Sequence, residues 1–402
     1  MLHSINSTLL SGCILIAVAL LSACNGTPVS SSSSSTTRQD NPFAGAKRWY
    51  VNPTWSDNVK RDGGDKVAGY NTGVWMDRVD TINYEGLDPT AGTGLREHLD
   101  EALRQRADLF QLVLYNVPGR NCARATFGTE LPASAAGMNT YKKDYIDRIT
   151  SILGEEKYAD IRIVAIIEAD SLVNLVVNSG VIPCNAVNNS NPWGYTEGVR
   201  YALTQLAKLK NVYSYLDIGH AGQMGADLLF SDGVKFFADV IAGGPHAGPT
   251  PAPGWGAISG FISNTANYTP LIEPYLANPA EEIGGKPLYS SRFYDGNRVF
   301  GELEFSTQWR EAMLKAGAPK RIGQLIDTAR NGWGGPKRPG QKASGTDVDK
   351  VVDASRIDRR PQRYEWCNQE SGIGERPIAN PRAGIHAYVW ARGPGESDGV
   401  SN

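Results

Sequence analysis

An apolar segment near the middle of the chain constrains the fold more than any other feature. The stretch 161–178 reads IRIVAIIEADSLVNLVVN, and its apolar residues run directly into Glu168 and Asp170. A run of this kind is typical of a parallel strand that is buried on both faces. Burying two carboxylates at the end of such a strand costs free energy unless they are paired or take part in a reaction. Because catalytic groups lie at the carboxyl ends of the strands in α/β barrels, the stretch predicts both an architecture and a general acid.

The rest of the chain alternates short apolar runs with amphipathic stretches. We expect strands at 73–76, 110–115, 161–167, 213–216, 257–262, 322–326 and 386–390. We expect helices at 95–109, 141–153, 196–209, 233–241 and 307–316. This alternation predicts an α/β fold, a single distorted (β/α) barrel of about seven mostly parallel strands with helices outside and long loops over the C-terminal face. An open doubly wound sheet is the alternative, although no glycine-rich phosphate-binding motif follows the first strand.

Polar residues follow the predicted strands at the points where the strands end. They are Asp77, Asn116, Glu168, Asp170, Asp217, His220, Asn264, Asp327, Arg330 and Arg392. Because the carboxyl ends of barrel strands share one face, we expect these side chains to surround one cleft. The segment 331–366 is long and rich in glycine, proline and charge, so we expect a lid or a binding loop there.

The N-terminus predicts export. Residues 1–24 form a signal peptide whose end, Leu21-Ser22-Ala23-Cys24, resembles a bacterial lipobox and implies lipid attachment to Cys24. An ordinary secretory signal is the alternative. Residues 25–41 are a Ser/Thr-rich linker, and 42–402 form the catalytic domain. We therefore expect a secreted or cell-surface protein that contacts the membrane only through an N-terminal lipid anchor.

Charge and cysteine content exclude some classes of partner. The net charge is −2 without a long basic run, so nucleic-acid binding has no electrostatic support. No cluster of His, Cys and Asp has metal-ligand spacing, and we expect neither a metal nor another cofactor. Beyond the signal, an odd number of cysteines remains, which favours one disulfide, Cys122–Cys184, and leaves Cys367 over. A free thiol, an intermolecular pair or a missing partner segment would account for Cys367. We expect a monomer.

Eight ordered segments resemble glycoside hydrolase family 6, the inverting cellobiohydrolases and endoglucanases, over nearly all of 41–402. They are LVLYNVPGRNC (112–122), VAIIEADSLVNLVVN (164–178), YLDIGHAG (215–222), GFISNTANY (260–268), LIDTARNGWGGP (325–336), RIDRR (356–360), EWCNQ (365–369) and PGESDG (394–399). Within the family the chain is most similar to bacterial cellobiohydrolases, whose long loops roof the cleft. The resemblance implies hydrolysis of β-1,4-glucosidic bonds with inversion and release of cellobiose from chain ends.

The resemblance also implies roles for individual residues. Asp170 matches the general acid, and its place after an apolar strand is expected to raise the pKa of its carboxyl group. Asp398 matches the position proposed for the base that serves the attacking water. Tyr115 matches a tyrosine that supports distortion of the sugar ring, and Asp217 an aspartate that orients a neighbouring charged group. Glu168 is expected to hold the strand end or to contact a sugar.

The expected substrate, cellulose or a cello-oligosaccharide, would be bound mainly by aromatic and paired charged groups. Trp75 and Trp366 match tryptophans that stack on glucose rings, and Arg392 with Glu396 matches a sugar-binding pair. The remaining predicted substrate-binding residues are Asp77, His220, Asn264 and Asn267. For His220, a structural, hydrogen-bonded role is favoured over catalysis.

Several residues depart from the family pattern. Asn121, included among the catalytic residues, stands where the family has an aspartate that keeps the general acid protonated. Phe127 falls near the position where the family has a serine that holds the catalytic water. Gln223 and Ala226 replace two tryptophans of the leaving-group side, and Arg392 replaces a lysine. Relatives also continue beyond PGESDG, so we expect a fragment or a truncated product.

Those departures keep two alternatives open beside the cellobiohydrolase. One is an endoglucanase that cuts internally. The other is a weakly active or non-catalytic, surface-tethered glucan-binding lipoprotein.

Overall fold

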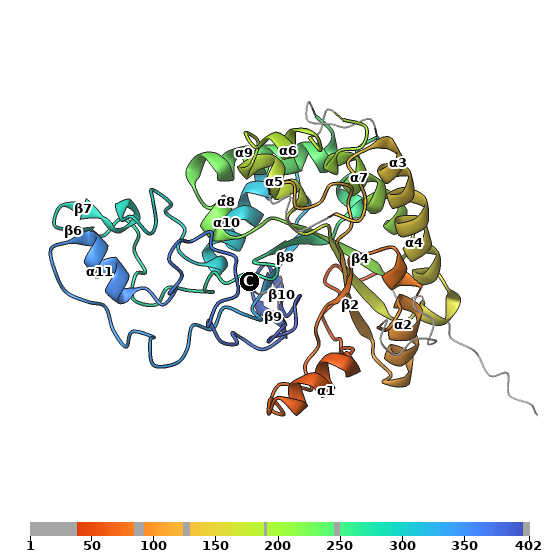
Figure 1. The fold of residues 1–402 in the computed structure, drawn as a ribbon, viewed down its shortest axis with the longest axis horizontal. Coiled ribbons are helices and arrows are strands. Elements are labelled where there is room, and N and C mark those ends of the chain that lie inside the picture. Colours follow the sequence, from red (N-terminus) through yellow and green to blue (C-terminus); the bar gives the residue numbers. More distant parts are fainter. Residues whose placement is uncertain (1–37, 84–91, 124–128, 189–190, 245–249, 397–402) are drawn as a thin grey trace, which may run out of the picture. The chain divides into compact units, whose positions relative to one another are not determined.

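One curled sheet organises the chain (Figure 1). The computed structural model describes residues 38–83, 92–123, 129–188, 191–244 and 250–396. Its eight strands follow the order β1-β2-β3-β4-β5-β8-β10-β9. Their bounds are β1 Val74–Met76, β2 Leu109–Leu114, β3 Arg162–Ile167, β4 Val212–Asp217, β5 Gly260–Ser263, β8 Gly323–Asp327, β9 Ile378–Arg382 and β10 Ile385–Val389. The seven predicted strands are all present, and the predicted fold class is confirmed.

The topology is that of a barrel and not of a doubly wound sheet. Neighbouring strands from β1 to β10 are parallel, and only the unpredicted edge strand β9 runs antiparallel, to β10. The strand order never reverses, as it would at the switch point of a doubly wound fold. The register pairs Leu109 with Arg162 and Leu114 with Ile167. The ends of β2 and β3 are therefore level, which places the residues after them side by side.

Helices cover the outer face of the sheet. They are α2 (Leu95–Arg104), α3 (Ala135–Thr140), the π-helical turn η3 (Tyr141–Ile146), α4 (Asp147–Leu153), α5 (Ser171–Val177), α6 (Ile182–Asn185), α7 (Tyr195–Leu206), α8 (Ala221–Met224), α9 (Asp227–Ala242) and α10 (Glu302–Lys315). Helix α1 (Pro53–Arg61) precedes β1, and the 3₁₀ turns are η1 (Asp80–Ile82), η4 (Glu156–Tyr158), η5 (Trp255–Ala257) and η6 (Leu288–Ser290). The helix predicted at 95–109 ends at Arg104 because the chain turns through the left-handed Arg106 (φ 55°) into β2.

Two apolar clusters lie on the two faces of the sheet. The larger cluster packs the helices against the outer face and includes Leu112, Ile163 and Phe237. The second fills the barrel interior with Val113, Ile166 and other alternate residues of the same strands. Because β2 and β3 contribute to both clusters, each is buried on both faces, as a continuous apolar run predicts.

The sheet closes through a narrow seam between β1 and the end of β10. The backbone N–H of Gly73 donates to the carbonyl of Trp390 at 2.9 Å, and the Trp75 indole donates to the carbonyl of Ala391 at 2.7 Å. A Cβ atom at Gly73 would lie 2.4 Å from the Ala391 oxygen, so only glycine permits this approach. These two bonds join the start of β1 to the end of β10 across the curled sheet, which forms a distorted half-barrel.

The segment 331–366 is more ordered than the predicted loop. It contains α11 (Val348–Ser355), whose first amides are capped by the Asp347 carboxylate. Val348 and Val352 pack against the apolar side chains of the segment 276–300, which also carries the short hairpin β6 (Glu282–Ile283) and β7 (Lys286–Pro287). Figure 1 shows β6, β7 and α11 together beside the carboxyl-end side of the sheet. The segment is thus a small packed lobe rather than a free lid.

The predicted signal, lipobox and most of the linker lie outside the described residues. Among the residues that are described, no helix combines the length and the apolar character needed to cross a bilayer.

Candidate active site

The ends of β3 and β4 hold Asp170 in one backbone position. Asp170 has a left-handed conformation (φ 63°), and its backbone N–H donates to Oδ1 of Asp217 at 3.1 Å. The same oxygen accepts the N–H of Gly219 at 3.0 Å. Asp217 is buried, and burial raises the pKa of its carboxyl group to about 6. Asp217 therefore positions Asp170 through the backbone, and its expected role of orienting a neighbouring charged group stays a prediction.

The two carboxylates at the end of β3 occupy opposite environments. Asp170 is exposed, whereas Glu168 is 1% exposed and accepts the N–H groups of Asn116 and Val117 at 2.8 and 2.9 Å. The Tyr141 hydroxyl donates to its other oxygen at 2.8 Å. Burial raises the pKa of Glu168 to about 7. The environment predicted for Asp170 thus belongs to Glu168, because the apolar run buries the first carboxylate and the turn carries the second into solvent.

Glu168 holds the strand end, which was one of its two expected roles. Its three donors come from the segment after β2 and from η3, so one carboxylate joins three elements. The segment that it anchors continues into residues 117–122, which carry Asn121. Glu168 contributes to the site by fixing its walls.

Tyr115 and Asn121 lie together beside Asp170. The Tyr115 hydroxyl donates to Oδ1 of Asn121, and Asn121 has a positive φ of 59°. The pKa of Tyr115 is raised above its ordinary value, first by burial and then by the negative charge of Asp170. Asp170 is therefore within electrostatic range of the tyrosine that was predicted to support the sugar.

Arg120, in the motif 112–122, was given no role from the sequence, but it contacts residues of the site. The Arg120 guanidinium lies 4.9 Å from the centroid of the Tyr115 ring and donates to the carbonyls of Asp77 and Tyr115. It therefore ties β1 to the end of β2. Asp77 takes part in this network through its backbone carbonyl.

Trp75 lies between Tyr115 and Arg392. The Trp75 and Tyr115 rings meet edge to face with centroids 5.4 Å apart, and the Arg392 guanidinium lies 5.0 Å from the Trp75 ring. Arg392 and Glu396 form the expected pair, with Nε and Oε2 3.5 Å apart. The structure thus brings together Trp75, Tyr115 and the Arg392–Glu396 pair.

Two predicted substrate contacts are structural instead. His220 is 1% exposed, and its Nδ1 accepts the N–H of Gly222 and faces the Thr269 hydroxyl at 2.9 Å. Asn264 is fully buried, and its amide donates to the carbonyls of Thr269 and Asp327. Neither side chain reaches the surface, so the prediction that they bind substrate is wrong for the described conformation. Both hold the turns after β4 and β5.

Two further predicted contacts remain accessible. Oδ1 of Asn267 accepts from Tyr268 N–H and from the Arg360 guanidinium, and Trp366, at the end of the segment 331–366, is half-buried. Arg360 is itself buried against Asp358 at 2.6 Å, which links Asn267 to the segment 356–360. Asp398 and Phe127 lie outside the described residues.

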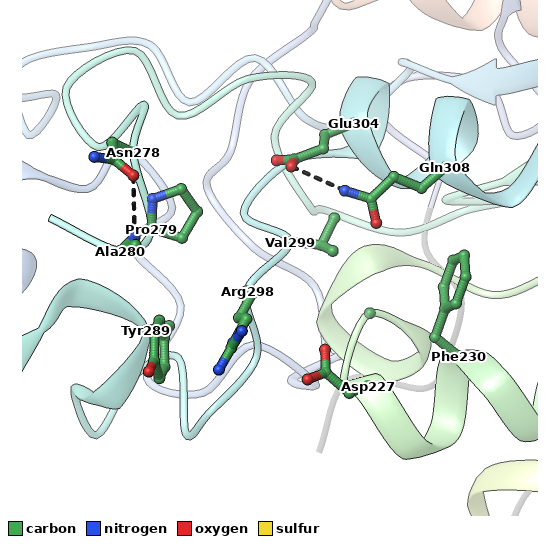
Figure 2. Close-up of a pocket in the computed structure, with 11 residues that line it drawn as sticks. Asp227, Phe230, Asn278, Pro279, Ala280, Tyr289, Arg298, Val299, Glu304 and Gln308 are labelled. Atoms are coloured by element: carbon green, nitrogen blue, oxygen red, sulfur yellow. Dashed lines mark hydrogen bonds between the residues drawn. The ribbon is translucent and has the colours of Figure 1, made fainter. Parts of the chain in front are cut away.

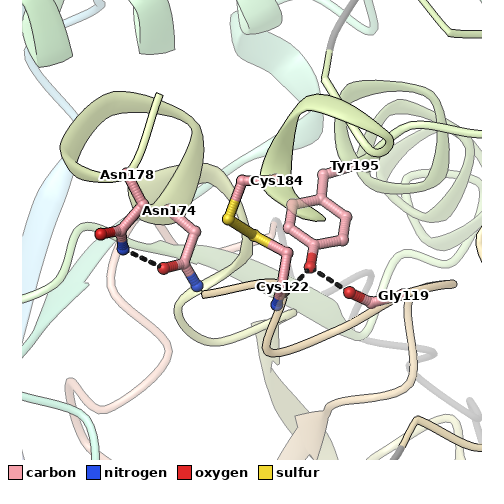
Figure 3. The surroundings of a disulfide bond; sticks show 6 residues. All are labelled: Gly119, Cys122, Asn174, Asn178, Cys184 and Tyr195. Carbon is pink, nitrogen blue, oxygen red and sulfur yellow. Dashed lines mark hydrogen bonds between the residues drawn. A yellow bond between two sulfur atoms is a disulfide. The ribbon is translucent and has the colours of Figure 1, made fainter. Parts of the chain in front are cut away.

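The predicted disulfide Cys122–Cys184 is present (Figure 3). It joins the residue after Asn121 to α6, and the Tyr195 hydroxyl beside it donates to Gly119 O and accepts from Cys122 N. The disulfide therefore ties the Asn121 segment to the chain that follows α5. Cys367 is exposed and forms no disulfide with another described residue.

Two buried acids, Asp327 and Glu302, received no specific role from the sequence. Asp327, which ends β8, receives the N–H groups of Ala266 and Ala329, and burial raises its pKa to about 6. Glu302 accepts the N–H of Ala221, and burial raises its pKa to about 7. Asp327 was visible as a polar residue after a strand, whereas nothing in the sequence marks Glu302. In the part of the chain that is described, no group of three or more His, Cys, Asp and Glu residues is placed to hold a metal ion.

An exposed carboxyl group beside aromatic side chains, at the carboxyl ends of barrel strands, is the arrangement of a carbohydrate-hydrolysing α/β barrel. The chain belongs to the glycosyl hydrolases family 6, whose family model matches residues 44–402.

Known proteins similar to this chain agree with that assignment. Exoglucanase A of Cellulomonas fimi is 41% identical over 93% of this chain, which spans 44% of that protein. The catalytic domain of Cellulomonas fimi Cel6B is 40% identical with a TM-score of 0.83, and the match covers 91% of this chain and 84% of that one. Cellobiohydrolase II (Cel6A) from Humicola insolens, in complex with glucose and cellotetraose, is 26% identical with a TM-score of 0.66, covering 90% and 88%.

Proposed function

We propose that this chain hydrolyses β-1,4-glucosidic bonds of cellulose or cello-oligosaccharides with inversion and releases cellobiose from chain ends. The observation that carries the proposal is Asp170, an exposed carboxyl group fixed by Asp217 at the end of β3 and flanked by Tyr115. The names of similar proteins, exoglucanases and cellobiohydrolases, support the substrate. Since the chain spans less than half of exoglucanase A, the activity of that whole protein is not assumed for it.

In the proposed reaction Asp170 acts as the general acid. Its carboxyl proton passes to the glycosidic oxygen as the bond to the anomeric carbon breaks, and water attacks that carbon from the opposite face. Asp398 is the proposed base for the water, on the motif PGESDG alone. A sugar above Asp170 would displace water from its carboxyl group and bring that group within reach of the glycosidic oxygen.

Aromatic and charged groups would orient the sugar. Trp75 and Trp366 would stack on the apolar faces of glucose, while the Arg392–Glu396 pair would hydrogen-bond to its hydroxyls. Tyr115 would press against the ring at the scissile bond, and its hydroxyl is held by Asn121.

The test is the anomer and rate of the first product from cellotetraose, followed by NMR, for the wild type and for Asp170→Asn. We expect α-cellobiose from the wild type and a loss of at least about a hundredfold in the variant, the scale of general acid catalysis. Asp160→Asn, on the surface before β3, is the matched control and should retain full activity. Equal rates for the wild type and Asp170→Asn would refute the role of Asp170, and β-cellobiose would refute inversion.

The mode of attack and the location are further parts of the proposal. Cellobiose as the main product with little loss of viscosity would distinguish the cellobiohydrolase from an endoglucanase, and equal, near-zero rates for the wild type and Asp170→Asn would indicate a glucan-binding protein. Export, lipid attachment at Cys24 and a monomeric state remain proposals. Mass spectrometry of the mature N-terminus and size-exclusion chromatography test them.

A further inference from the structure

The end of the barrel opposite the candidate active site carries an excess of positive charge. We call it the amino-end face, and its charged residues come from the described segments 38–48, 105–108, 154–162, 207–211, 316–322 and 382–384. These segments contain 11 Lys and Arg residues against five Asp and Glu residues, whereas the whole chain has a net charge of −2. Positive charge is therefore concentrated at this end, and no basic run in the sequence reveals it.

The pairing of the strands places these segments together. Leu109 and Arg162, the first residues of β2 and β3, are partners in the parallel register. The antiparallel strand β9 ends at Arg382, which pairs with Ile385, the first residue of β10. Because parallel strands begin at the same edge of a sheet, the segments that lead into them share one face.

Contacts between neighbouring segments gather the basic side chains further. Nε of Arg48 donates to the carbonyl of Arg106 at 2.9 Å. The Arg38 guanidinium donates to the carbonyl of Lys210 at 3.4 Å, and the charge of Arg321 also acts on Arg38. Side chains of like charge repel each other, so gathering them destabilises the folded chain. An anionic partner at this face would remove that cost.

The acidic residues of the face balance little of this charge. The carboxylate of Asp108 accepts the backbone N–H groups of Lys47 and Arg48 at 2.9 to 3.1 Å. Three of the five acidic residues lie in the single segment 154–162, where Glu155 pairs with Arg96 of α2 at 2.6 Å. Six of the basic side chains are exposed in the other segments, and they are Lys47, Arg48, Arg106, Lys208, Lys210 and Lys320.

The same face holds the segment that continues toward the N-terminus. Phe43 is buried in the apolar cluster of the barrel interior, and Arg162 donates to the carbonyl of Pro42 at 2.7 Å. Cys24, where lipid attachment is proposed, lies 14 positions before Arg38 in the sequence. A chain of that length spans at most about 50 Å when fully extended. A lipid at Cys24 would therefore keep the membrane within reach of the amino-end face.

We propose that the amino-end face docks on an anionic lipid membrane, in addition to any lipid anchor at Cys24. Lipid phosphates supply the negative charge that the face lacks, and each Lys or Arg close to such a surface strengthens binding. A neutral glucan would gain nothing from these charges. The preference for an anion comes from the face itself, whereas the choice of a membrane rests on the lipid attachment in the proposed function.

Docking through this face would leave the opposite end of the barrel open to substrate. Asp170 and Tyr115 follow β3 and β2 at their carboxyl ends. The hollow of about 400 Å³ between α9, α10 and the segment 278–299 is lined by both neighbours of Ala226, so it belongs to the leaving-group side of that same end (Figure 2). Because the two ends of parallel strands lie on opposite sides of a barrel, the proposed active site would point away from the membrane.

The test is sedimentation of the purified chain 25–402 with vesicles, without substrate. This chain lacks the apolar signal and the lipid, and it retains the compact unit 38–402. We expect binding to vesicles of phosphatidylglycerol and phosphatidylcholine, and none to phosphatidylcholine alone. Combining Lys208→Glu, Lys210→Glu and Lys320→Glu should weaken binding by at least about a hundredfold, since each basic residue near an anionic surface contributes about fivefold. Salt at about 1 M, where the screening length is about 3 Å, should release the wild type.

The matched control makes the same charge change at the other end of the barrel. It combines Lys286→Glu, Lys337→Glu and Lys350→Glu, three exposed residues in the segments that follow β5 and β8, and it should bind as the wild type does. Equal loss of binding in the control and in the amino-end variant would overturn the assignment to this face.

The remaining outcomes separate this proposal from the proposed function. Equal binding of the wild type to neutral and anionic vesicles, or no binding to either, would overturn the proposal even if the chain hydrolyses cellotetraose. A chain that binds anionic vesicles through this face but does not hydrolyse cellotetraose would retain the proposal and lose the activity. Tighter binding to a DNA duplex than to anionic vesicles at the same salt concentration would overturn the choice of a membrane.

Discussion

The buried carboxylate of Glu168 connects the fold of this chain to the pH at which it is stable. Its two oxygens accept two backbone N–H groups and one tyrosine hydroxyl. Glutamine at this position can keep all three contacts: its oxygen accepts both N–H groups, and the Tyr141 hydroxyl turns to accept from the amide. Glu168→Gln therefore removes the ionisation of the group without leaving a buried donor unsatisfied.

The size of the effect follows from the pKa. Burial raises the pKa of Glu168 from its ordinary 4.5 to about 7. Between those values the folded chain binds more protons than the unfolded chain, so the free energy of unfolding falls as the pH rises. The contribution is fully present below pH 4.5 and is lost as the pH passes 7. A shift of this size corresponds to about 3 kcal/mol.

Urea denaturation from about pH 4.5 to about pH 8 measures this contribution. We expect the wild type to lose about 3 kcal/mol more stability over this range than Glu168→Gln. The other buried acids, including Glu273 and Glu302, titrate in both proteins, so the difference isolates Glu168. Glu156→Gln, an exposed control, should follow the wild type. If the free energy of unfolding changed equally with pH in the wild type and in Glu168→Gln, the contribution of Glu168 to stability would not depend on its charge.

Two further predictions concern the segment 115–122. Asn121→Asp places a negative charge beside Tyr115 and should raise the rate of cellotetraose hydrolysis roughly tenfold, which lowers the activation barrier by about 1.4 kcal/mol. The steady-state rate measures this effect. An unchanged or lower rate would contradict a supporting role for charge at this position. Replacing both Cys122 and Cys184 by serine opens a loop of 62 residues and should lower the free energy of unfolding by about 4 kcal/mol, measured by urea denaturation. Cys367→Ser is its control and should change nothing, and an unchanged midpoint in the double variant would count against the cross-link.

The strands were predictable because most of them are buried on both faces. The nearly continuous apolar run 161–167 has the length of a buried strand and is too short for most helices. Strand β9 was missed because its sequence, IANPR, alternates exposed and half-exposed residues and contains a proline, which suits an edge strand. Helix α11 was missed in the glycine- and proline-rich segment 331–366. Its signal was present, as Asp347 precedes valines at 348, 351 and 352.

The proximity of several candidate site residues was predictable from the sequence, whereas their environments were not. The level ends of parallel strands place Tyr115, Asp170 and Asp217 together, and strand positions alone indicate this. Which carboxylate is buried depends on left-handed turns at Glu168 (φ 46°) and Asp170 (φ 63°). A sequence does not reveal those conformations at non-glycine residues. For His220, the structural, hydrogen-bonded role favoured from the sequence agrees with its contacts to Gly222 and Thr269.

A bound ligand would help to hold β1 against the end of β10 at the seam between them. Among the described residues, a backbone bond from Gly73 to Trp390 and a side-chain bond from the Trp75 indole to the Ala391 carbonyl cross it. Regions closed by so few bonds open locally at a lower free energy than the core. A glucose ring that rests on Trp75 and the neighbouring Arg392 would contact both edges of the sheet at once. The empty enzyme should then exchange its amide hydrogens faster at residues 73–75 and 390–391 than in β3, and a bound oligosaccharide should slow that exchange more than it slows exchange in β3.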